Sequence, residues 1–459
     1  MSSTISLDDL APRLRGPAIT PEDAAYDEVR AVYNAMHDCR PRVVVMAEDD
    51  LDVMATVNFA RENGLDLAVR GGGHSTPGYG TCDGGVVLDL GRIRNVRVDP
   101  GARTARVGGG AKLGALDHAT HAYGLAVPAG FVSTTGVGGL TLGGGIGYLN
   151  RKHGLTCDSL VSADVITAAG ERVTASRGEN PDLFWALRGG GGNFGVVTAF
   201  EFALHPVRDI VGGPIFFEYE AAGDVMRAWS EHMKGAPREL GAFFGFHIAP
   251  PLPFLPEDRH GDHMCVLVTC WCGDPDDGEA AIEPLRNAGP VVGAHVGRMS
   301  YPALQSAFDA LLPPGLYSYW KSDFAGDLGD EAIEVHLEHG RGVPNVHSGM
   351  HIYPIDGAVH DVEPDETAFG VRDARFAVNV VGLWPDDADT ETNRGWVRDY
   401  YDAIHPYSGY EGGYTNFMDA EDQARVRENY GATYDRLAEV KATWDPGNLF
   451  RLNQNIVPV

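Results

Sequence analysis

The chain lacks the features that mark membrane-spanning, disulfide-stapled and nucleic-acid-binding proteins. No window comes near about 18 uninterrupted apolar residues, so no membrane-spanning helix is predicted. The six cysteines are sparse and form no C-x-x-C pair, which argues against a disulfide scaffold. The chain has five lysines and a net charge of −28, and such a charge repels phosphates. Neither nucleic acid nor a membrane is therefore expected as a partner.

Targeting and metal-binding signals are missing as well. Residues 1–14 contain neither a basic segment nor a long apolar one, so no signal peptide is predicted and the cytoplasm is the expected location. His118 and His121 stand three residues apart, as do His336 and His339, but such a pair needs further ligands to hold a metal. We expect solvated helix faces at both pairs and no metal site.

Glycine, by contrast, is abundant, with 59 residues. The run "RGGGHS" (70–75) follows a predicted strand, and "GFVSTTGVGGLTLGGGIGYL" (130–149) is too rich in glycine to predict a helix or an ordinary strand. Consecutive glycines let backbone N–H groups converge on one point, which suits a pyrophosphate. The two runs together favour one extended dinucleotide lying between them. The alternative is that both form only tight turns.

Two common nucleotide-binding motifs do not fit the sequence. "GGGNFG" (190–195) matches G-x-G-x-x-G, but it follows a predicted helix and precedes a predicted strand. A nicotinamide-binding loop has the opposite order. No G-x-x-x-x-G-K-[ST] occurs, so a Walker-type site is not predicted either.

The hydrophobic pattern predicts two α+β regions, since 459 residues are too many for one core of ordinary size. In the first region, a helix over 49–64 follows a buried strand at 43–47, and hairpins are predicted at 96–107 and 164–175. Glycine becomes rarer near residue 205, where we place a boundary. Beyond it, strand-like runs such as "MHIYPIDGAV" and "RFAVNVVGLW" alternate with helical patterns up to about residue 405.

Five segments carry a resemblance to a known family. The chain resembles the berberine-bridge-enzyme-like branch of the vanillyl-alcohol oxidase and p-cresol methylhydroxylase (PCMH) flavoproteins. The similarity extends from residue 43 to the end and is loose over the middle 200 residues or so. The segments are "RGGGHS" (70–75), "TTGVGGLTLGGGIGYLNRKHGLTCDSL" (134–160), "GGGGNFGVVT" (189–198), "GGYTNFMD" (412–419) and "YDRLAEVKATWDPGNLFRLNQNI" (434–456).

The resemblance implies an α+β, two-domain PCMH-type fold. Residues 1–205 and the returning segment 406–459 would form the FAD-binding domain. Residues 206–405 would form a substrate domain, an antiparallel sheet covered by helices. The sheet would lie over the flavin ring.

The resemblance also implies FAD bonded to the protein at two points. A histidine at the His74 position is bonded to the flavin 8α-methyl carbon, and a cysteine at the Cys157 position to flavin C6. A neutral imidazole and a thiolate can both add to an electrophilic flavin. The alternatives are a capped loop histidine and a buried structural thiol. The further residues expected to contact FAD are Arg70, Gly71, Gly72, Gly73, Ser75, Gly78, Gly136, Gly138, Gly139, Gly143, Gly144, Gly195, Val197, Tyr414, Asn416 and Asn453.

The catalytic base is expected at Tyr414, in a Y-x-N-[YF] motif whose Asn416 would share its strand face. A free tyrosine titrates near pH 10, so this base needs a cationic neighbour or a shared proton. Plant relatives place a lysine on a nearby strand, where this chain has Ala377 followed by Asn379. Lys321 and Arg375 are the candidate replacements.

Other residues are expected around the reacting end. Asp361, with His360 before it, stands where some relatives carry a catalytic carboxylate; a solvated strand end is the alternative. Tyr148 and Asn150 are expected near the flavin edge. Leu160 is expected beside the carbon that reacts with oxygen, where its bulk could slow O₂.

These features predict an oxidase that removes a hydride from an alcohol or amine carbon of a small molecule and is reoxidised by O₂, giving hydrogen peroxide. One alternative is a dehydrogenase with a different acceptor. Another is a flavin-bearing drug-binding or resistance protein that sequesters an aromatic product. We expect a monomer or a homodimer, and the substrate is not readable from the sequence.

Overall fold

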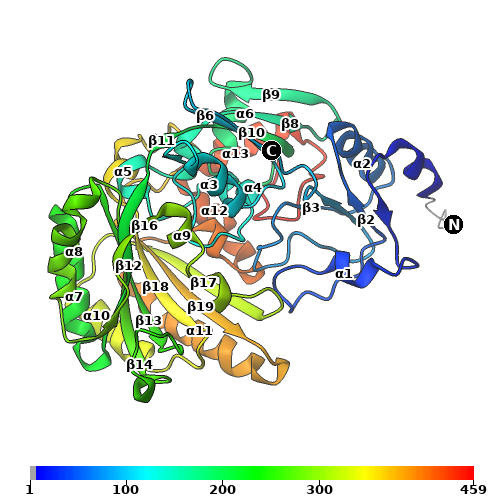
Figure 1. Ribbon diagram of the computed structural model, residues 1–459. Helices are drawn as coiled ribbons and strands as arrows, with labels where there is room; N and C mark the ends of the chain where they lie inside the picture. Colours follow the sequence, from blue (N-terminus) through cyan, green and yellow to red (C-terminus); the bar gives the residue numbers. More distant parts are fainter. Residues whose placement is uncertain (1–6) are drawn as a thin grey trace.

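The computed structural model describes residues 7–459 (Figure 1). The first six residues, on which the prediction of no signal peptide partly depends, lie outside the described residues. The described chain forms an α+β structure with two smaller sheets on one side and one large antiparallel sheet on the other (Figure 1).

The first sheet is built where buried apolar runs precede the first glycine loop. Its order is β1-β2-β4-β3, with β2 and β3 both parallel to β4. The predicted helix is present as α2 (Asp50–Glu62), because the Asp49 carboxylate accepts hydrogen bonds from the first-turn N–H groups. The strands are β1 (Ala18–Ile19), β2 (Val43–Met46), β3 (Leu67–Arg70) and β4 (Val86–Asp89).

The second sheet contains both predicted hairpins and has the order β5-β6-β10-β8-β9. Two short strands form a separate antiparallel pair: β7 (Leu125–Ala126), which follows β6 in the chain, and β11 (His205–Pro206), which follows β10. The predicted boundary near residue 205 falls at the end of this pair. The five strands are β5 (Val96–Asp99), β6 (Thr104–Gly108), β8 (Leu160–Ile166), β9 (Arg172–Ser176) and β10 (Val196–Ala203).

The third sheet is the eight-stranded antiparallel one, in the order β15-β12-β14-β13-β18-β19-β17 with β16 paired to β12. Its strands are β12 (Asp209–Glu218), β13 (Leu240–Ile248), β14 (His263–Trp271), β15 (Val291–Ala294), β16 (Gly297–Ser300), β17 (Tyr317–Ala325), β18 (Gly349–Pro354) and β19 (Phe376–Trp384). Four helices cover its outer face (Figure 1): α7 (Ala222–Gly235), α8 (Gly278–Arg286), α10 (Asp330–Gly340) and α11 (Thr390–Ile404).

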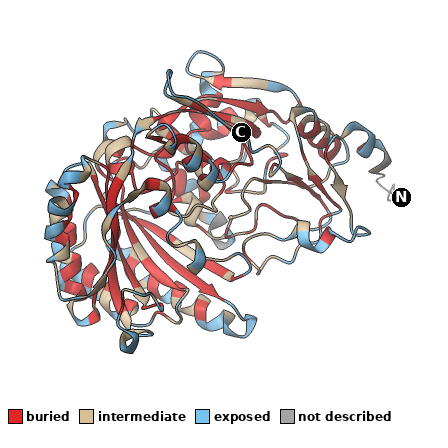
Figure 2. Cartoon of the chain, in the orientation of Figure 1, coloured by how far each residue is buried: buried red, intermediate tan, exposed pale blue. Residues whose placement is uncertain are grey.

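Alternation along these strands separates two apolar layers. On β18 and β19, Met350, Ile352, Val378 and Val380 belong to the core under the outer helices. The residues between them point the other way, because successive side chains of a strand leave opposite faces. Figure 2 shows the strands of this sheet buried along most of their length, whereas the outer helices expose one side. The inner face of the sheet is therefore turned toward the glycine-rich half.

The remaining helices are short and connect or close the layers. Both ends of the described chain belong to the glycine-rich half, since β1 pairs with β2 and α13 packs on α6. No helix in residues 7–459 is long and apolar enough to cross a membrane. These helices are α1 (Tyr26–Arg30), α3 (Leu113–His121), α4 (Val137–Leu142), α5 (Asn150–His153), α6 (Pro181–Ala186), α9 (Tyr301–Gln305), α12 (Val426–Tyr430) and α13 (Tyr434–Trp444).

Three local predictions are wrong. The second glycine run does contain a helix, α4, which its neighbours in the fold hold in place despite the low helix propensity of glycine. Tyr414 precedes a 3₁₀ turn, Thr415–Phe417, so Asn416 is not on a strand. His336 is fully buried, because α10 packs against α11, and its Nδ1 lies 2.9 Å from the Tyr400 hydroxyl oxygen.

Candidate active site

A cavity of about 350 Å³ lies between the glycine loops and the inner face of the large sheet; we call it the central cavity. Its walls come from the loop after β3, the loop and helix around α4, the run before β10, the inner faces of β17, β18 and β19, and the segments around residues 414–418 and 450–454. Parts of the chain hundreds of residues apart therefore share one cavity.

Glycines bring the cavity walls into backbone contact. A Cβ atom at Gly72 would lie 2.4 Å from the backbone nitrogen of Gly136, so the two glycine loops touch where neither has a side chain. A Cβ at Gly139, by contrast, would meet nothing within 4 Å. The first pair of glycines is required by the contact between loops, and Gly139 leaves open room in the cavity.

Most of the predicted cofactor residues line this cavity. Those that do are Arg70, Gly71, Gly72, Gly73, His74, Ser75, Gly136, Gly138, Gly139, Gly195, Val197, Tyr414, Asn416 and Asn453. Gly78, Gly143 and Gly144 do not line it. Instead, hypothetical Cβ atoms there would meet His37, Asn416 and Phe369, which shows that these glycines permit close packing behind the wall.

His74 ends the first glycine loop and lines the cavity. Its ring stacks on Tyr33 with the centroids 4.1 Å apart. Burial lowers the pKa of His74 to about 4, and the positive charge of Lys112 adds to that effect. The imidazole is therefore neutral near pH 7 and carries a free lone pair, as a nucleophile requires.

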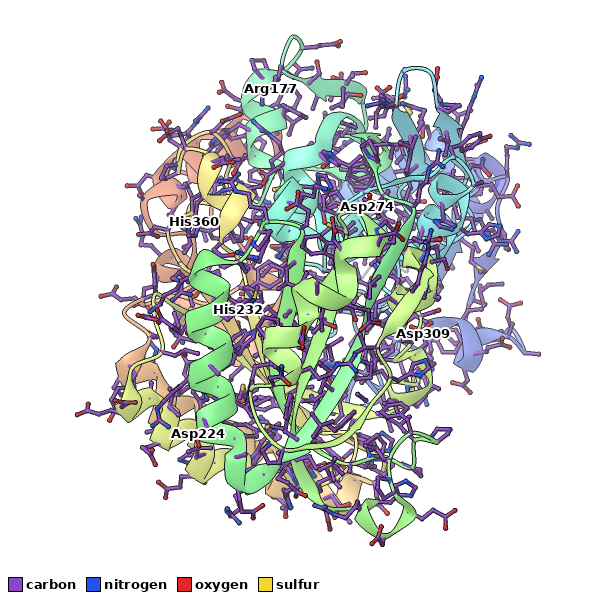
Figure 3. The ribbon with its side chains drawn as sticks, turned by 60° about the vertical axis from the view of Figure 1, so that its left-hand side comes forward. Arg177, Asp224, His232, Asp274, Asp309 and His360 are labelled. Carbon is purple, nitrogen blue, oxygen red and sulfur yellow. The ribbon has the colours of Figure 1, made fainter. Side chains whose placement is uncertain are left out.

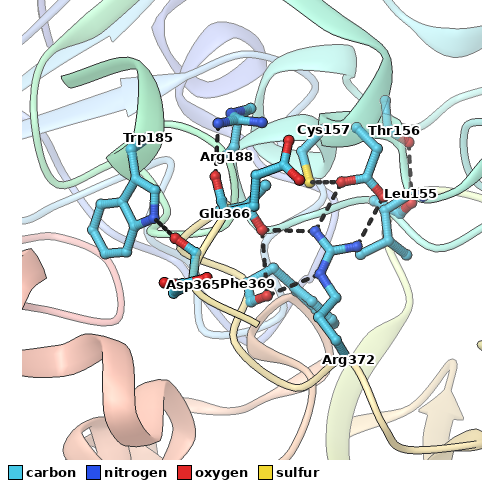
Figure 4. Close-up of polar contacts among 12 residues, drawn as sticks. Leu155, Thr156, Cys157, Trp185, Arg188, Asp365, Glu366, Phe369 and Arg372 are labelled. Atoms are coloured by element: carbon cyan, nitrogen blue, oxygen red, sulfur yellow. Dashed lines mark hydrogen bonds and ion pairs between the residues drawn. The ribbon is translucent and has the colours of Figure 1, made fainter. Parts of the chain in front are cut away.

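Cys157 is fully buried behind the cavity wall and is not one of its lining residues. Its backbone N–H donates to the carbonyl of Gly144, 2.8 Å away. The thiol lies 3.6 Å from an Asp158 oxygen, and the Asp158 carboxylate is held by two 2.8 Å bonds from Arg372. Figure 4 shows Cys157 and Arg372 in this cluster. Burial raises the pKa of the Cys157 thiol, and the nearby Arg372 and Arg188 oppose that rise.

Tyr414 is almost completely buried, and its hydroxyl oxygen is surrounded by donors. The oxygen accepts hydrogen bonds from the N–H of Gly145 at 2.9 Å, from the N–H of Ile146 at 3.4 Å and from Asn416 Nδ2 at 2.8 Å. Burial nevertheless raises the pKa of Tyr414 to about 12, although these bonds lower it. Tyr414 is thus a phenol near neutral pH in this structure.

Arg70 is the only lysine, arginine, aspartate or glutamate among the described residues that line the cavity. Its charge is already used by the protein. Nε donates to Asp89, 2.5 Å away, and the other nitrogens donate to backbone carbonyls of the α1 region. Arg70 therefore braces the first glycine loop rather than presenting a free charge to a pyrophosphate.

Of the residues expected on the sheet side, the structure brings only Asn379 to the cavity. Lys321 lies on β17 with its Nζ 4.9 Å from the centroid of the Tyr401 ring. Arg375 forms an ion pair with Asp327, at 2.8 Å. Neither cation lines the cavity, so neither is placed to activate Tyr414.

Asp361 does not reach the cavity either. It ends a 3₁₀ segment, Gly357–Asp361, that turns away after β18, and it is exposed and paired with Arg238. The Nε2–H of His360, the residue before it, donates to the carbonyl of Ala374, 2.8 Å away, and Figure 3 shows His360 on the left side of the molecule. Asp361 is therefore a solvent-exposed residue at the end of this segment, as the alternative to a catalytic carboxylate stated.

Tyr148 and Asn150, expected near the flavin edge, and Leu160, expected beside the carbon that reacts with oxygen, are buried and do not line the cavity. Tyr148 is buried and packs edge-on against Phe131, which does line the cavity. The Asn150 Oδ1 accepts from the N–H of Gly147 at 2.7 Å, so it shapes the second glycine loop. Leu160 packs in the core beneath the second sheet.

Several cavity residues were not predicted. Phe131, Trp320, His351 and Tyr353 all line the cavity, and Phe131 stacks on Tyr353 with the centroids 4.3 Å apart. For His351 and Tyr353, the only signal in the sequence is that they alternate with buried aliphatic residues along one predicted strand. That alternation shows that the two share a face, but it does not tell which face points at the cofactor.

A buried ion pair ties the C-terminal segment to the third glycine run. Lys441 Nζ lies 2.6 Å from an Asp445 oxygen and donates to the carbonyl of Asn193 at 2.7 Å. Asp445 also accepts from the N–H groups of Leu449 and Phe450. The ion pair thus brings the segment with Asn453 and Gln454 to the cavity wall.

The residues present fit a dinucleotide. A Cβ atom at Gly139 would meet nothing within 4 Å, and one at Gly192 would meet only Asn453 Nδ2 at 4.0 Å, so a large flat ligand can approach the backbone closely. The side-chain amide of Gln454 lines the cavity with both its oxygen and its nitrogen buried and without a partner in the protein. Such groups need partners from a ligand or water. No group of three metal-ligating side chains gathers within residues 7–459.

Comparisons with known proteins agree with this reading. A family model described as "FAD binding domain" matches residues 41–176, and one described as "Berberine and berberine like" matches residues 413–457. An FAD-linked oxidoreductase of Dictyostelium discoideum is 32% identical over 423 residues, covering 91% of this chain and 89% of that protein.

Solved structures show the same fold over the whole chain. The crystal structure of 6-hydroxy-D-nicotine oxidase from Arthrobacter nicotinovorans superposes with a TM-score of 0.87 at 27% identity, covering 100% of both chains. Glucooligosaccharide oxidase from Acremonium strictum, described as carrying a 6-S-cysteinyl, 8α-N1-histidyl FAD, has a TM-score of 0.86 at 23% identity and covers 99% of both chains.

A two-domain PCMH-type fold with glycine loops around a cavity defines an FAD-linked oxidoreductase. The chain belongs to the berberine-bridge-enzyme-like family of these flavoproteins.

Proposed function

We propose that the protein is an oxidase that removes a hydride from an alcohol or amine carbon of a small organic molecule, with O₂ as electron acceptor and with FAD bonded to both His74 and Cys157. The observation that carries this proposal is that His74 and Tyr414 line the same cavity from opposite ends of the chain. FAD, when bound there, would accept the hydride at N5.

The double attachment rests on the state of the two side chains. His74 is neutral, faces the cavity and is held by its stacking on Tyr33. Cys157 is a buried thiol that does not line the cavity, and the positive charges of Arg372 and Arg188 favour its thiolate form against the effect of burial. Glucooligosaccharide oxidase, with the same fold, is described with both linkages.

The chain's own residues would bind, orient and shield the reacting carbon. Asn416 and the two backbone N–H groups hold the Tyr414 oxygen in place, so its hydroxyl is fixed at the cavity wall. Because Tyr414 keeps its proton near pH 7, it would orient a substrate oxygen as a hydrogen-bond donor unless ligand binding lowers its pKa. The aromatic wall of Phe131, Tyr353 and Phe417 would exclude water.

Retention of the yellow colour tests the attachment. After acid precipitation, FAD should stay with the protein, and the intact mass should include one FAD. His74→Ala and Cys157→Ala should each still retain FAD through the other bond, and the double variant should release it. A colourless wild-type pellet would contradict the covalent proposal without touching the family assignment.

Oxygen consumption tests the reaction. A screen over benzylic alcohols, sugars and cyclic amines should give consumption of O₂ with matching production of hydrogen peroxide for at least one class. Substrate-dependent bleaching of the flavin that is followed by slow recovery in air would instead identify a dehydrogenase with another acceptor. We further propose a cytoplasmic location, which fractionation of the source cells would test.

A further inference from the structure

We propose that His351 is the group that takes the hydroxyl proton of the substrate, and that the pocket around it is built for an uncharged aromatic alcohol. The inference deepens the proposed function and rests on it for the removal of the hydride. Its central test, however, measures binding and does not require turnover.

His351 occupies the middle of the inner face of the large sheet. It lies on β18, directly across from Asn379 on β19 and from Gly245 on β13. Both His351 and Asn379 line the central cavity. A Cβ atom at Gly245 would lie 3.1 Å from the His351 ring, so the missing side chain there makes room for the imidazole.

Two polar atoms of this pair are buried and have no partner in the protein. They are His351 Nδ1 and Asn379 Oδ1. Most buried polar atoms in folded proteins are hydrogen-bonded, and one left unpaired costs free energy. Two such atoms on adjacent strands, in residues that line a cavity, indicate groups reserved for a ligand.

A second histidine fixes which nitrogen of His351 carries the proton. The Nε2 atoms of His351 and His247 lie 2.8 Å apart, so one must donate to the other. His247 also has a hydrogen bond with the Ser348 backbone. Because the Ser348 N–H already donates to Asn345 Oδ1, 3.1 Å away, the partner of His247 is the Ser348 carbonyl, and His247 donates to it.

The hydrogen bonds from His351 to His247 and from His247 to Ser348 then have only one arrangement if both rings are neutral. His247 gives its single proton to the Ser348 carbonyl, so its Nε2 accepts from the Nε2–H of His351. His351 Nδ1 is left as an unprotonated lone pair. Burial lowers the pKa of both rings, which keeps them neutral near pH 7. The chain thus holds a base in one tautomer beside the cavity.

The surrounding wall specifies the rest of the substrate. Phe131, Tyr353, Trp320 and Phe417 line the cavity around this pair, and Tyr353 and Phe417 have centroids 5.7 Å apart. Trp320 Nε1 is a buried donor without a partner. No carboxylate and no lysine lie among the described lining residues, and Arg70 is already paired. This wall favours a flat, uncharged molecule with a hydroxyl group.

The chemical step balances with these groups. The C–H bond of the alcohol would break with its electron pair leaving as a hydride, which FAD would accept when bound. The O–H bond on the oxygen of that carbon would break, its electron pair would form the second bond of the new carbonyl, and the proton would pass to His351 Nδ1. The imidazolium then returns that proton to water. His247 acts as a positioning residue because it sets the tautomer of His351.

Paired probes test the lone pair without turnover. The holoenzyme is titrated with 4-nitrophenol, below the pKa of that phenol, and with 4-nitroanisole, which has the same nitrophenyl ring but a methoxy group that cannot donate. Wild type should bind 4-nitrophenol about tenfold more tightly, as one good hydrogen bond provides. His351→Leu should lower that ratio to about one and leave the affinity for 4-nitroanisole largely unchanged. That second result shows an intact pocket.

Three variants sharpen the result. His118→Leu, an exposed histidine on α3, is the matched control and should keep the wild-type ratio. His247→Phe should reduce the ratio, since His351 is then free to change tautomer. His351→Gln keeps an acceptor but no base, so it should retain part of the ratio while kcat for an alcohol found in the oxygen screen falls at least about 100-fold.

The outcomes separate the two proposals. A wild-type ratio near one, or a ratio that survives in His351→Leu, overturns the hydrogen bond to His351. Wild-type turnover in His351→Gln overturns its role as the base. If no alcohol or amine drives oxygen consumption, the proposed function fails, whereas the binding ratio still decides whether His351 recognises a hydroxyl group.

Discussion

The two walls of the central cavity are built from opposite kinds of residue. In the glycine loops the working element is the backbone, and at Gly72 and Gly136 it works because no side chain is present. On the sheet face the working elements are side chains, and His351 and Asn379 retain polar atoms that the protein leaves unpaired. The difference indicates that the cofactor side is selected for close fit, and that the substrate side gives up stability to keep binding groups available.

If this contrast is right, the largest losses of stability should come from the cofactor side. Lys441→Met leaves the Asp445 carboxylate buried and without its cation, so the free energy of unfolding should fall by about 3–5 kcal/mol in denaturant titrations. Arg451→Met, which removes an exposed pair with Asp66 in the same segment, should cost less than about 1 kcal/mol. Equal losses would contradict the role assigned to the buried pair.

The next effect distinguishes two glycines. Gly72→Ala forces a Cβ against the backbone of Gly136, so it should destabilise the protein by about 1–3 kcal/mol and reduce the FAD retained on purification. Gly139→Ala meets open space within α4 and should leave the stability of the apoprotein unchanged or slightly raised. Thermal unfolding of both variants, each combined with His74→Ala and Cys157→Ala so that FAD is released, measures this, and similar melting temperatures would refute the loop contact.

A smaller effect, from acid, should fall on the sheet half through its buried histidines. The pKa of His336 is lowered by burial to about 3, so its unfolded form binds a proton near pH 6.5 when the folded form does not. Its contribution is complete above pH 6.5 and is lost as the pH falls. At about one pH unit below 6.5, protonation of His336 in the unfolded chain should lower the free energy of unfolding by roughly 1 kcal/mol.

His336→Gln should remove that part of the pH dependence. The free energies of unfolding of variant and wild type should be measured at two pH values. They should differ less in acid than at a pH where His336 is neutral in both the folded and the unfolded wild type. A constant difference between the two proteins would mean that His336 does not stay neutral in the fold.

The smallest change in stability should come from the substrate wall. Asn379→Leu removes an oxygen that has no partner, so the free energy of unfolding should change by less than about 0.5 kcal/mol while 4-nitrophenol binds more weakly. Asn34→Leu is the matched control. That buried amide donates to the Thr76 and Ser318 carbonyls and accepts from two N–H groups, so its loss should cost several times more. Both are measured by denaturant titration.

The same contrast explains what could be predicted from the sequence. The glycine runs, the position of His74 and the hairpins depend on local patterns, and the structure contains those loops and hairpins where the patterns lie. The helix α4 within a glycine run was not predictable, since contacts between loops outweigh the low propensity of its residues.

The sheet wall depends on strand register, which no single segment specifies. His351 meets Asn379 and Gly245 only because β18 lies between β19 and β13. A slip of one residue would turn His351 outward toward the helices. Asp361 illustrates the reverse error: a carboxylate expected from family position lies past the point where the chain leaves the sheet, and it pairs with Arg238 in solvent.

The contact between Gly72 and Gly136 also limits how such an enzyme can diverge. Each glycine blocks a side chain at the other, so no single substitution at either position escapes the clash, and even a paired change would have to separate two loops that share one cofactor. New specificities are therefore easier to reach by point mutation in the strands facing those loops. Because the two glycine loops tolerate little change, divergence of this enzyme is expected mainly at the residues that touch the substrate.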